Sequence, residues 1–170
     1  MVARLFLVGL ILSSDPLATV DDAGPLTQSS VDELLAVILD RTLTIKEYLP
    51  SRGLLPSKGT ILVREEIEGS RFVVTKRALK EPGPWSIRPY RRLQQQADTT
   101  RKSVYFVIVD AIVINQDRAV LKVGVDITSP PPDDPKLVSI QTCCCWGTDH
   151  YQRDNTGRWR FLKRDNVKCY

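Results

Sequence analysis

Two long runs of strand-forming residues, each followed by a turn and a second such run, constrain this chain more than any other feature. The first pair of runs spans residues 104–128 and the second spans residues 137–165. Both are rich in Val, Ile, Thr and aromatic residues, and Asn, Asp and Gly interrupt them at the turns. This pattern is typical of antiparallel β-hairpins. We therefore expect a sheet built largely from hairpins, around one core that a chain of 170 residues is long enough to bury.

Alternation of apolar side chains sets the register of the first of these hairpins. With the turn centred on Gln116, one face is wholly apolar and should be the core. That face holds Tyr105, Val107, Val109, Ala111, Val113, Ala119, Leu121, Val123, Val125 and Ile127. The other face holds Phe106, Ile108 and Asp110, with Asp110 opposite Lys122, and a slip of one residue would mix the two sets. Because this second face is also largely apolar, we expect another part of the chain, or a second copy in a homodimer, to cover it.

The final hairpin predicts a disulfide. A turn closed by Gly157 starts a ladder that places Tyr151 opposite Phe161 and Cys143 opposite Cys169. Directly opposed residues in an antiparallel pair are close enough for their sulfurs to bond. The alternative is that all four cysteines of the chain are buried and keep free thiols. The disulfide is favoured only if the protein is exported to an oxidising compartment.

One long helix should precede the strands. Ser30, with Glu33 three residues later, matches a capping pattern, and apolar residues then recur every three or four positions over residues 30–49. The other side of this helix, which includes Asp32, should face water. The sequence therefore predicts an amphipathic helix with one buried side.

A further hairpin and a long connection lie between this helix and the two hairpins described above. Residues 60–68 and 71–79 flank Gly69, and they predict a hairpin with a two-residue turn. The connection at residues 80–103 includes a stretch near 90–97 that predicts a short second helix. The sum is an α+β fold, with one long N-terminal helix packed on a curved antiparallel sheet of about six strands arranged as hairpins.

This order of elements resembles the cystatin-like and nuclear-transport-factor-two-like superfolds over residues 30–165. Both groups place an N-terminal helix inside a strongly bent antiparallel sheet. The segment GRWRFLKRD at residues 157–165 is similar to the closing hairpin of the second group, in which an aromatic residue follows a glycine turn. The resemblance implies a pocket between helix and sheet. It carries over no catalytic residue, because these folds host enzymes, binders and assembly modules alike and no family motif is matched.

The first residues have the order of a secretory signal. Arg4 precedes an apolar stretch that ends at Leu12, and polar residues then break it. The stretch is too short to cross a bilayer as a helix, which needs about 20 residues, so we expect no transmembrane span. We predict that residues 1–22 are a signal peptide or leader and that residues 23–170 form a single α+β domain, secreted or periplasmic. The alternative is a cytoplasmic protein whose N-terminal segment docks on the core.

No complete catalytic, cofactor or metal motif is present, so we expect no cofactor and no metal. Asp110 is the strongest candidate for a catalytic carboxylate because it interrupts an apolar row. Its simpler role is an ion pair with Lys122 across the ladder, worth roughly 0.2–1 kcal/mol. His150, the only histidine, is the second candidate. Its neighbour Asp149 points to the other face of the strand and cannot orient it, which favours a protein without catalytic activity.

Charge is concentrated in the middle of the chain. Residues 71–102 hold nine basic and two acidic groups, a balance of +7. The candidate basic surface in this segment consists of Lys76, Arg77, Lys80, Arg88, Arg91 and Arg92. Basic residues interleaved with aromatic residues can bind single-stranded nucleic acid. Three aromatic residues over this length are few, however, so the pattern favours a charged surface loop and we do not expect a nucleic-acid partner.

Together these features favour an exported ligand-binding or assembly module, without catalytic activity, whose pocket between helix and sheet holds a small apolar ligand. One alternative is a small enzyme of the same fold that uses carboxylates in that pocket. The other is a basic interaction module that acts through residues 71–102.

Overall fold

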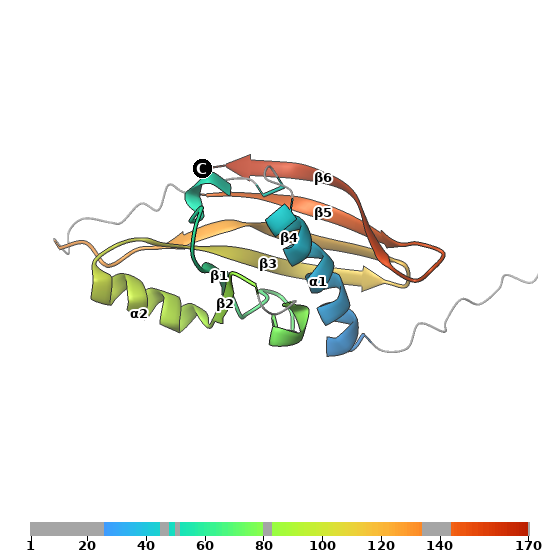
Figure 1. The fold of residues 1–170 in the computed structure, drawn as a ribbon, viewed down its shortest axis with the longest axis horizontal. Coiled ribbons are helices and arrows are strands. Elements are labelled where there is room, and N and C mark those ends of the chain that lie inside the picture. The colour runs from blue at the N-terminus through green and yellow to red at the C-terminus, as the bar shows by residue number, and fades with distance from the viewer. Residues whose placement is uncertain (1–25, 45–47, 50–51, 80–82, 134–143, 170) are drawn as a thin grey trace, which may run out of the picture.

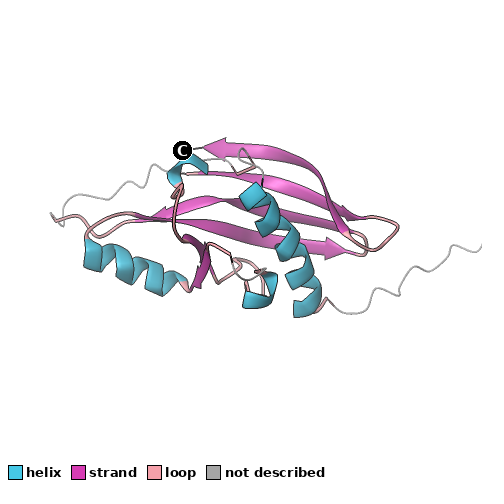
Figure 2. Ribbon diagram, viewed as in Figure 1, coloured by secondary structure: helices cyan, strands magenta, loops and turns pink. Residues whose placement is uncertain are grey.

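The computed structural model describes residues 26–44, 48–49, 52–79, 83–133 and 144–169. These residues form one sheet with a helix on each face (Figures 1 and 2). In chain order the elements are α1 (Gln28–Thr44), the 3-10 helix η1 (Arg52–Leu54), β1 (Ile61–Arg64), the 3-10 helix η2 (Lys76–Ala78), β2 (Trp85–Arg88), α2 (Tyr90–Thr100), β3 (Val104–Asn115), β4 (Arg118–Thr128), β5 (Cys145–Arg153) and β6 (Trp159–Cys169). The expected leader lies outside the described residues. Within the described ranges, no helix is both long and apolar enough to cross a membrane.

The sheet is mixed, which corrects part of the predicted fold. Its strand order is β2-β1-β3-β4-β5-β6. From β3 to β6 each strand pairs antiparallel with the next, as predicted. At the other end β1 runs parallel to both β2 and β3. The α+β class and the N-terminal helix are therefore confirmed, whereas the expectation of a wholly antiparallel sheet is wrong.

The predicted hairpin around Gly69 accounts for this difference. It forms only one bridge, between Glu66 and Val73, in the expected register. The chain then turns into η2, where the Thr75 hydroxyl accepts a hydrogen bond from the Arg77 N–H (3.2 Å). A strand has two edges, and β2 and β3 already occupy both edges of β1. No edge is left for the segment after the turn, so the second strand of this hairpin cannot form.

β2 and β3 run in the same direction on either side of β1, and α2 lies in the crossover connection that leads from β2 to β3. The short helix predicted near residues 90–97 is thus confirmed and spans Tyr90–Thr100. It packs Leu93 and Ala97 against Phe106 and Ile108, on the face of β3 opposite α1. The chain itself therefore covers part of the second apolar face, and the homodimer stays a prediction.

The β3–β4 hairpin keeps the predicted register only as far as the pair Asp110–Lys122. A β-bulge follows at Ala111, where φ is 49°, and the pairing beyond it shifts by one residue. As a result Ile112 packs on the core, whereas Val113, which the sequence placed in the core, is 63% exposed. A register predicted from the alternation of apolar and polar residues cannot anticipate such an extra residue in one strand.

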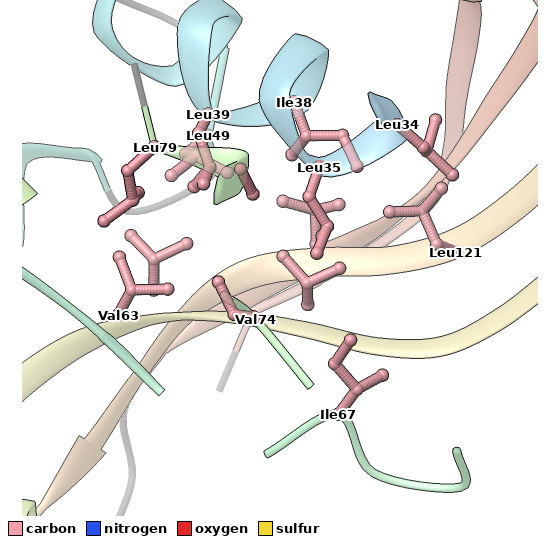
Figure 3. Packing of buried hydrophobic residues seen from close by; sticks show 14 of the residues in the cluster. Leu34, Leu35, Ile38, Leu39, Leu49, Val63, Ile67, Val74, Leu79 and Leu121 are labelled. Carbon is pink, nitrogen blue, oxygen red and sulfur yellow. The ribbon is translucent and has the colours of Figure 1, made fainter. Parts of the chain in front are cut away.

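Helix α1 packs on one face of the sheet and supplies the main core (Figure 3). It starts at Gln28 rather than at Ser30, because Thr27 Oγ1 accepts a hydrogen bond from the Ser30 N–H (3.3 Å). The predicted apolar side is buried against the strands. Its contacts join Val31, Leu34, Leu35 and Ile38 to Val63, Val107, Leu121 and Val123. Asp32 is buried rather than solvated, since its Oδ1 accepts hydrogen bonds from Gln28 (2.8 Å) and Thr75 (2.9 Å).

Candidate functional site

An open pocket of about 440 Å³ lies between α1 and the turn that joins β5 to β6. The helix contributes Glu33, Ala36 and Val37 to its wall. The hairpin contributes Gly157, Arg158, Trp159 and Arg160. Small-molecule sites in proteins usually measure about 300–1,000 Å³, so the pocket is large enough for a ligand of several heavy atoms. We take it as the candidate ligand site.

The helical side of this pocket is largely apolar. Glu33, Ala36 and Val37 are three and four positions apart, which places them on the same side of α1. Ala36 and Val37 are half-buried, and the short side chain of Ala36 leaves space in front of the helix. The side chains of Ala36 and Val37 can contact an apolar ligand without breaking any polar interaction of the protein.

Hydrogen bonds to Asp154 fix the conformation of the β5–β6 turn, which forms the hairpin side of the pocket. Asp154 Oδ1 accepts hydrogen bonds from the Thr156 hydroxyl (2.6 Å) and from the N–H groups of Thr156 (2.9 Å) and Arg158 (3.1 Å). The bond from the Thr156 hydroxyl is the main cause that holds the pKa of the Asp154 carboxyl far below its usual range. Gly157 has φ 78°, a conformation that glycine adopts without strain. The turn therefore places Trp159 at a fixed position on the inner face of β6.

Trp159 is the most deeply buried residue of the pocket wall, at 5% exposure. The Arg153 guanidinium lies over its ring, 4.5 Å from the centroid. Its indole Nε1 is buried and has no hydrogen-bond partner in the described part of the chain. A buried N–H without an acceptor costs about 1–3 kcal/mol.

Charged side chains surround the pocket, and most of them are paired. Arg153 binds Glu33 (3.1 Å), and Arg160 binds Asp154 (2.8 Å). Arg158 is exposed and has no acidic partner among the described residues. Of the three arginines around this pocket, Arg158 is therefore the cation available to an anionic or acceptor group on a ligand.

A buried ion pair ties β5 and β6 to the segment after α1. Arg164 donates two hydrogen bonds to Asp149 (2.5 and 2.9 Å) and a third to the Tyr48 carbonyl. The Tyr48 hydroxyl donates to Asp149, and burial raises the pKa of both Tyr48 and Tyr151 above the usual range, so both hydroxyls stay protonated. Gly147 makes room for this arrangement, because a Cβ there would lie 2.7 Å from Arg164 Cδ. The cluster does not line the pocket and holds the fold together.

Asp110 is joined to Arg64 of β1 rather than to Lys122. It lies opposite Lys122 as predicted, but its carboxylate accepts hydrogen bonds from the Arg64 guanidinium and from the Glu68 N–H (2.9 Å). Burial raises the pKa of Asp110, which is 2% exposed, and these two donors oppose that shift. Lys122 instead lies over the Trp146 ring (4.3 Å). Asp110 is not part of the pocket wall, and its contacts attach the turn after β1 to β3.

His150 also lies away from the pocket wall. Its Nε2 is 3.1 Å from Asp165 Oδ2, and Asp165 binds Lys163 as well (2.8 Å). The hydrogen bond from Lys163, followed by that from His150, holds the pKa of the Asp165 carboxyl below its usual range. Neither of the two candidates for catalysis, Asp110 and His150, is therefore brought to the pocket.

The disulfide joins Cys169 to Cys145 and not to the predicted Cys143, which lies outside the described residues. The ladder begins as predicted, with Tyr151 opposite Phe161. Two register shifts follow, and each adds one residue to β6. Together the two bulges move the partner of Cys169 by two positions along β5.

The predicted basic surface is divided between two places. Lys76 and Arg77 lie on η2, which packs against α1. The three arginines within residues 88–92 lie at the junction of β2 and α2, and α2 packs on the opposite face of the sheet. Lys80 is outside the described residues. The described members of this set therefore come from separate elements of the fold, and the basic surface stays a prediction.

Reasoning from the sequence alone did not identify Trp159 or Arg158 as residues of a candidate ligand site. The sequence did contain one signal for Trp159, which is the aromatic residue after a glycine turn on which the resemblance was based. What could not be read from the sequence was that this turn packs beside the exposed flank of α1. That proximity depends on the packing of segments more than 100 residues apart, such as Glu33 and Arg153.

Comparison with known proteins identifies no relative. No family model matches the chain, and no curated protein or solved structure matches it significantly. The resemblance to the cystatin-like and nuclear-transport-factor-two-like superfolds therefore stays a prediction. The function has to be argued from the pocket itself.

Proposed function

We propose that this protein is an exported binding module, without catalytic activity, that holds a small apolar molecule between α1 and the β5–β6 turn. The observation that carries the proposal is the pocket of about 440 Å³, whose wall combines Ala36 and Val37 of the helix with Trp159 of the hairpin. Apolar pockets with a few polar groups at defined positions are the usual form of small-molecule sites.

The wall indicates the chemistry of the ligand. Ala36, Val37 and the Trp159 ring offer an apolar surface. Arg158 at the edge offers a positive charge. The ligand that fits is a small molecule with an apolar body and one acceptor or anionic group.

The arrangement of titratable groups favours binding over catalysis. Among the described residues that line this pocket, Glu33 is the sole carboxylate, and it is paired with Arg153. An acid–base mechanism needs titratable groups that converge on one point in the site. Asp110 and His150, which could have supplied such groups, lie elsewhere.

The proposed export is supported by the disulfide between Cys145 and Cys169. Structural disulfides persist mainly in oxidising compartments such as the periplasm and the extracellular space. The order of charged, apolar and polar residues at the start of the chain points the same way.

The test uses anilinonaphthalene sulfonate, a fluorescent probe with an apolar body and one anionic group. We expect the folded protein to bind it at one saturable site, and Val37→Trp, which fills the pocket, to weaken binding at least tenfold. The control is Val113→Trp, which adds the same side chain at an exposed position outside the pocket wall. Circular dichroism checks that both variants are folded. Equal binding by the two variants, or no saturable binding by the wild type, would overturn the proposal.

A further inference from the structure

A second pocket, which shares no residue with the first, lies where β2 passes into α2. It measures about 450 Å³ and is lined by Arg88, Pro89, Arg92 and Gln96. Arg88 is the last residue of β2, and the other three lie on one side of the start of α2, three and four positions apart. The fold therefore brings two arginines from different elements to one cavity with a polar wall.

The positive charge in this pocket is not neutralised by the protein. Arg88 and Arg92 are both exposed, and neither has an acidic partner within the described residues. The only side-chain bond of Arg92 there is to the amide oxygen of Gln95 (2.8 Å). Glu66 approaches this region, but its carboxylate accepts the Tyr90 N–H (2.9 and 3.1 Å) at the start of the helix. Two like charges in one cavity repel each other, and an anion bound between them would offset that repulsion.

We propose that this pocket binds an oxyanion, a phosphate or carboxylate group on a small molecule. The guanidinium groups of Arg88 and Arg92 act as the charged donors, and the side-chain amide of Gln96 acts as a neutral donor. Arginine suits this role because its planar fork donates two parallel hydrogen bonds to a carboxylate or phosphate. The cavity is larger than a bare ion requires, so the anionic group belongs to a larger molecule.

Basic residues outside the pocket provide a control. They test whether an anion binds at this pocket or is attracted only by the overall positive charge. Lys76 lies on η2 and Arg118 at the start of β4, and neither lines the pocket. Replacing both of them removes as much charge as replacing Arg88 and Arg92. The pair Lys76→Gln with Arg118→Gln is therefore the matched control for the pair Arg88→Gln with Arg92→Gln.

The experiment is calorimetric titration of the full chain with inorganic pyrophosphate and, separately, with citrate, at constant ionic strength. We expect at least one probe to bind saturably, the R88Q/R92Q protein to bind it at least tenfold more weakly, and the K76Q/R118Q protein to bind it within twofold of the wild type. Pyrophosphate binding alone indicates a phosphate ligand, and citrate binding alone indicates a carboxylate ligand. The proposal is overturned if neither probe binds, or if both double variants lose affinity equally.

Discussion

Replacing Asp149 by Asn should destabilise the protein more than any surface substitution, although it changes only one group of one side chain. Asp149 is fully buried, and its carboxylate accepts two hydrogen bonds from Arg164 and one from Tyr48. Asparagine keeps the shape but removes the charge. The Arg164 guanidinium, whose side chain is 12% exposed, is then left without a counter-ion.

The size of the effect follows from that uncompensated charge. Breaking a buried ion pair by removing one partner typically costs about 3–5 kcal/mol, because the remaining charge stays out of water. Domains of this size unfold at a cost of about 5–15 kcal/mol. Asp149→Asn should therefore remove at least about a fifth of the stability, and about 40% of it at the middle of both ranges. With a urea dependence of about 2 kcal/mol per molar, the unfolding midpoint should fall by about 2 M.

Urea unfolding followed by circular dichroism measures this change. The control is Glu33→Gln, which removes the exposed ion pair with Arg153 and should cost less than about 1 kcal/mol. The double variant Asp149→Leu with Arg164→Met should recover more than half of the loss, since it leaves no buried charge unpaired. If Asp149→Asn costs no more than Glu33→Gln, the buried pair does not hold β5 and β6 as we describe.

Two further predictions concern the same end of the sheet. Loss of the disulfide, by reduction or by Cys169→Ser, should lower the free energy of unfolding by about 3 kcal/mol, as expected for a loop of this length between residues 24 positions apart; Cys145→Ser should reproduce the loss in urea unfolding, and a similar loss from Cys143→Ser would contradict this pairing. Gly147→Ala should lower the free energy of unfolding by about 1–3 kcal/mol, because the new Cβ would displace Arg164. The control is Gly53→Ala, where a Cβ meets nothing within 4 Å. Equal stability of the two variants in thermal unfolding would exclude that steric conflict.

The parts of the fold that follow from periodicity were predictable. The buried side of α1 and the register of β3 and β4 up to Asp110 depend on alternation that a sequence displays directly. A register shift of one residue would have exposed the core side chains, so few alternatives competed. The pairing of Tyr151 with Phe161 followed in the same way from a turn with a glycine at a fixed position.

The parts that were missed depend on local irregularity or on competition between strands. The bulges in β3 and β6 each insert one residue, and no residue pattern marked their positions. The two bulges in β6 determine that Cys145 rather than Cys143 reaches Cys169. The parallel arrangement of β1 could not be read from its four residues, because it depends on which strands reach its two edges first.

The candidate pocket was not predicted from the sequence. The resemblance in the order of elements implied a pocket between helix and sheet, which stays a prediction, and it named none of the residues that line the pocket between α1 and the β5–β6 turn. Val37 and Trp159 line the same pocket because the start of β6 lies beside α1. Titratable residues such as Asp110 attracted attention in the sequence because they interrupt apolar rows. In the structure that interruption is explained by the ion pair with Arg64.

The irregular spacing of β6 has a consequence for the behaviour of this protein in concentrated solution. β6 is the outermost strand of the sheet, and a straight outermost strand is a template on which another molecule can add its own strand. Two bulges interrupt the regular repeat of donors and acceptors along β6, and basic side chains such as Lys163 and Lys168 project from it. A strand from another molecule finds no continuous row of backbone donors and acceptors on β6. This edge of the sheet therefore resists the edge-to-edge association that leads to fibrils.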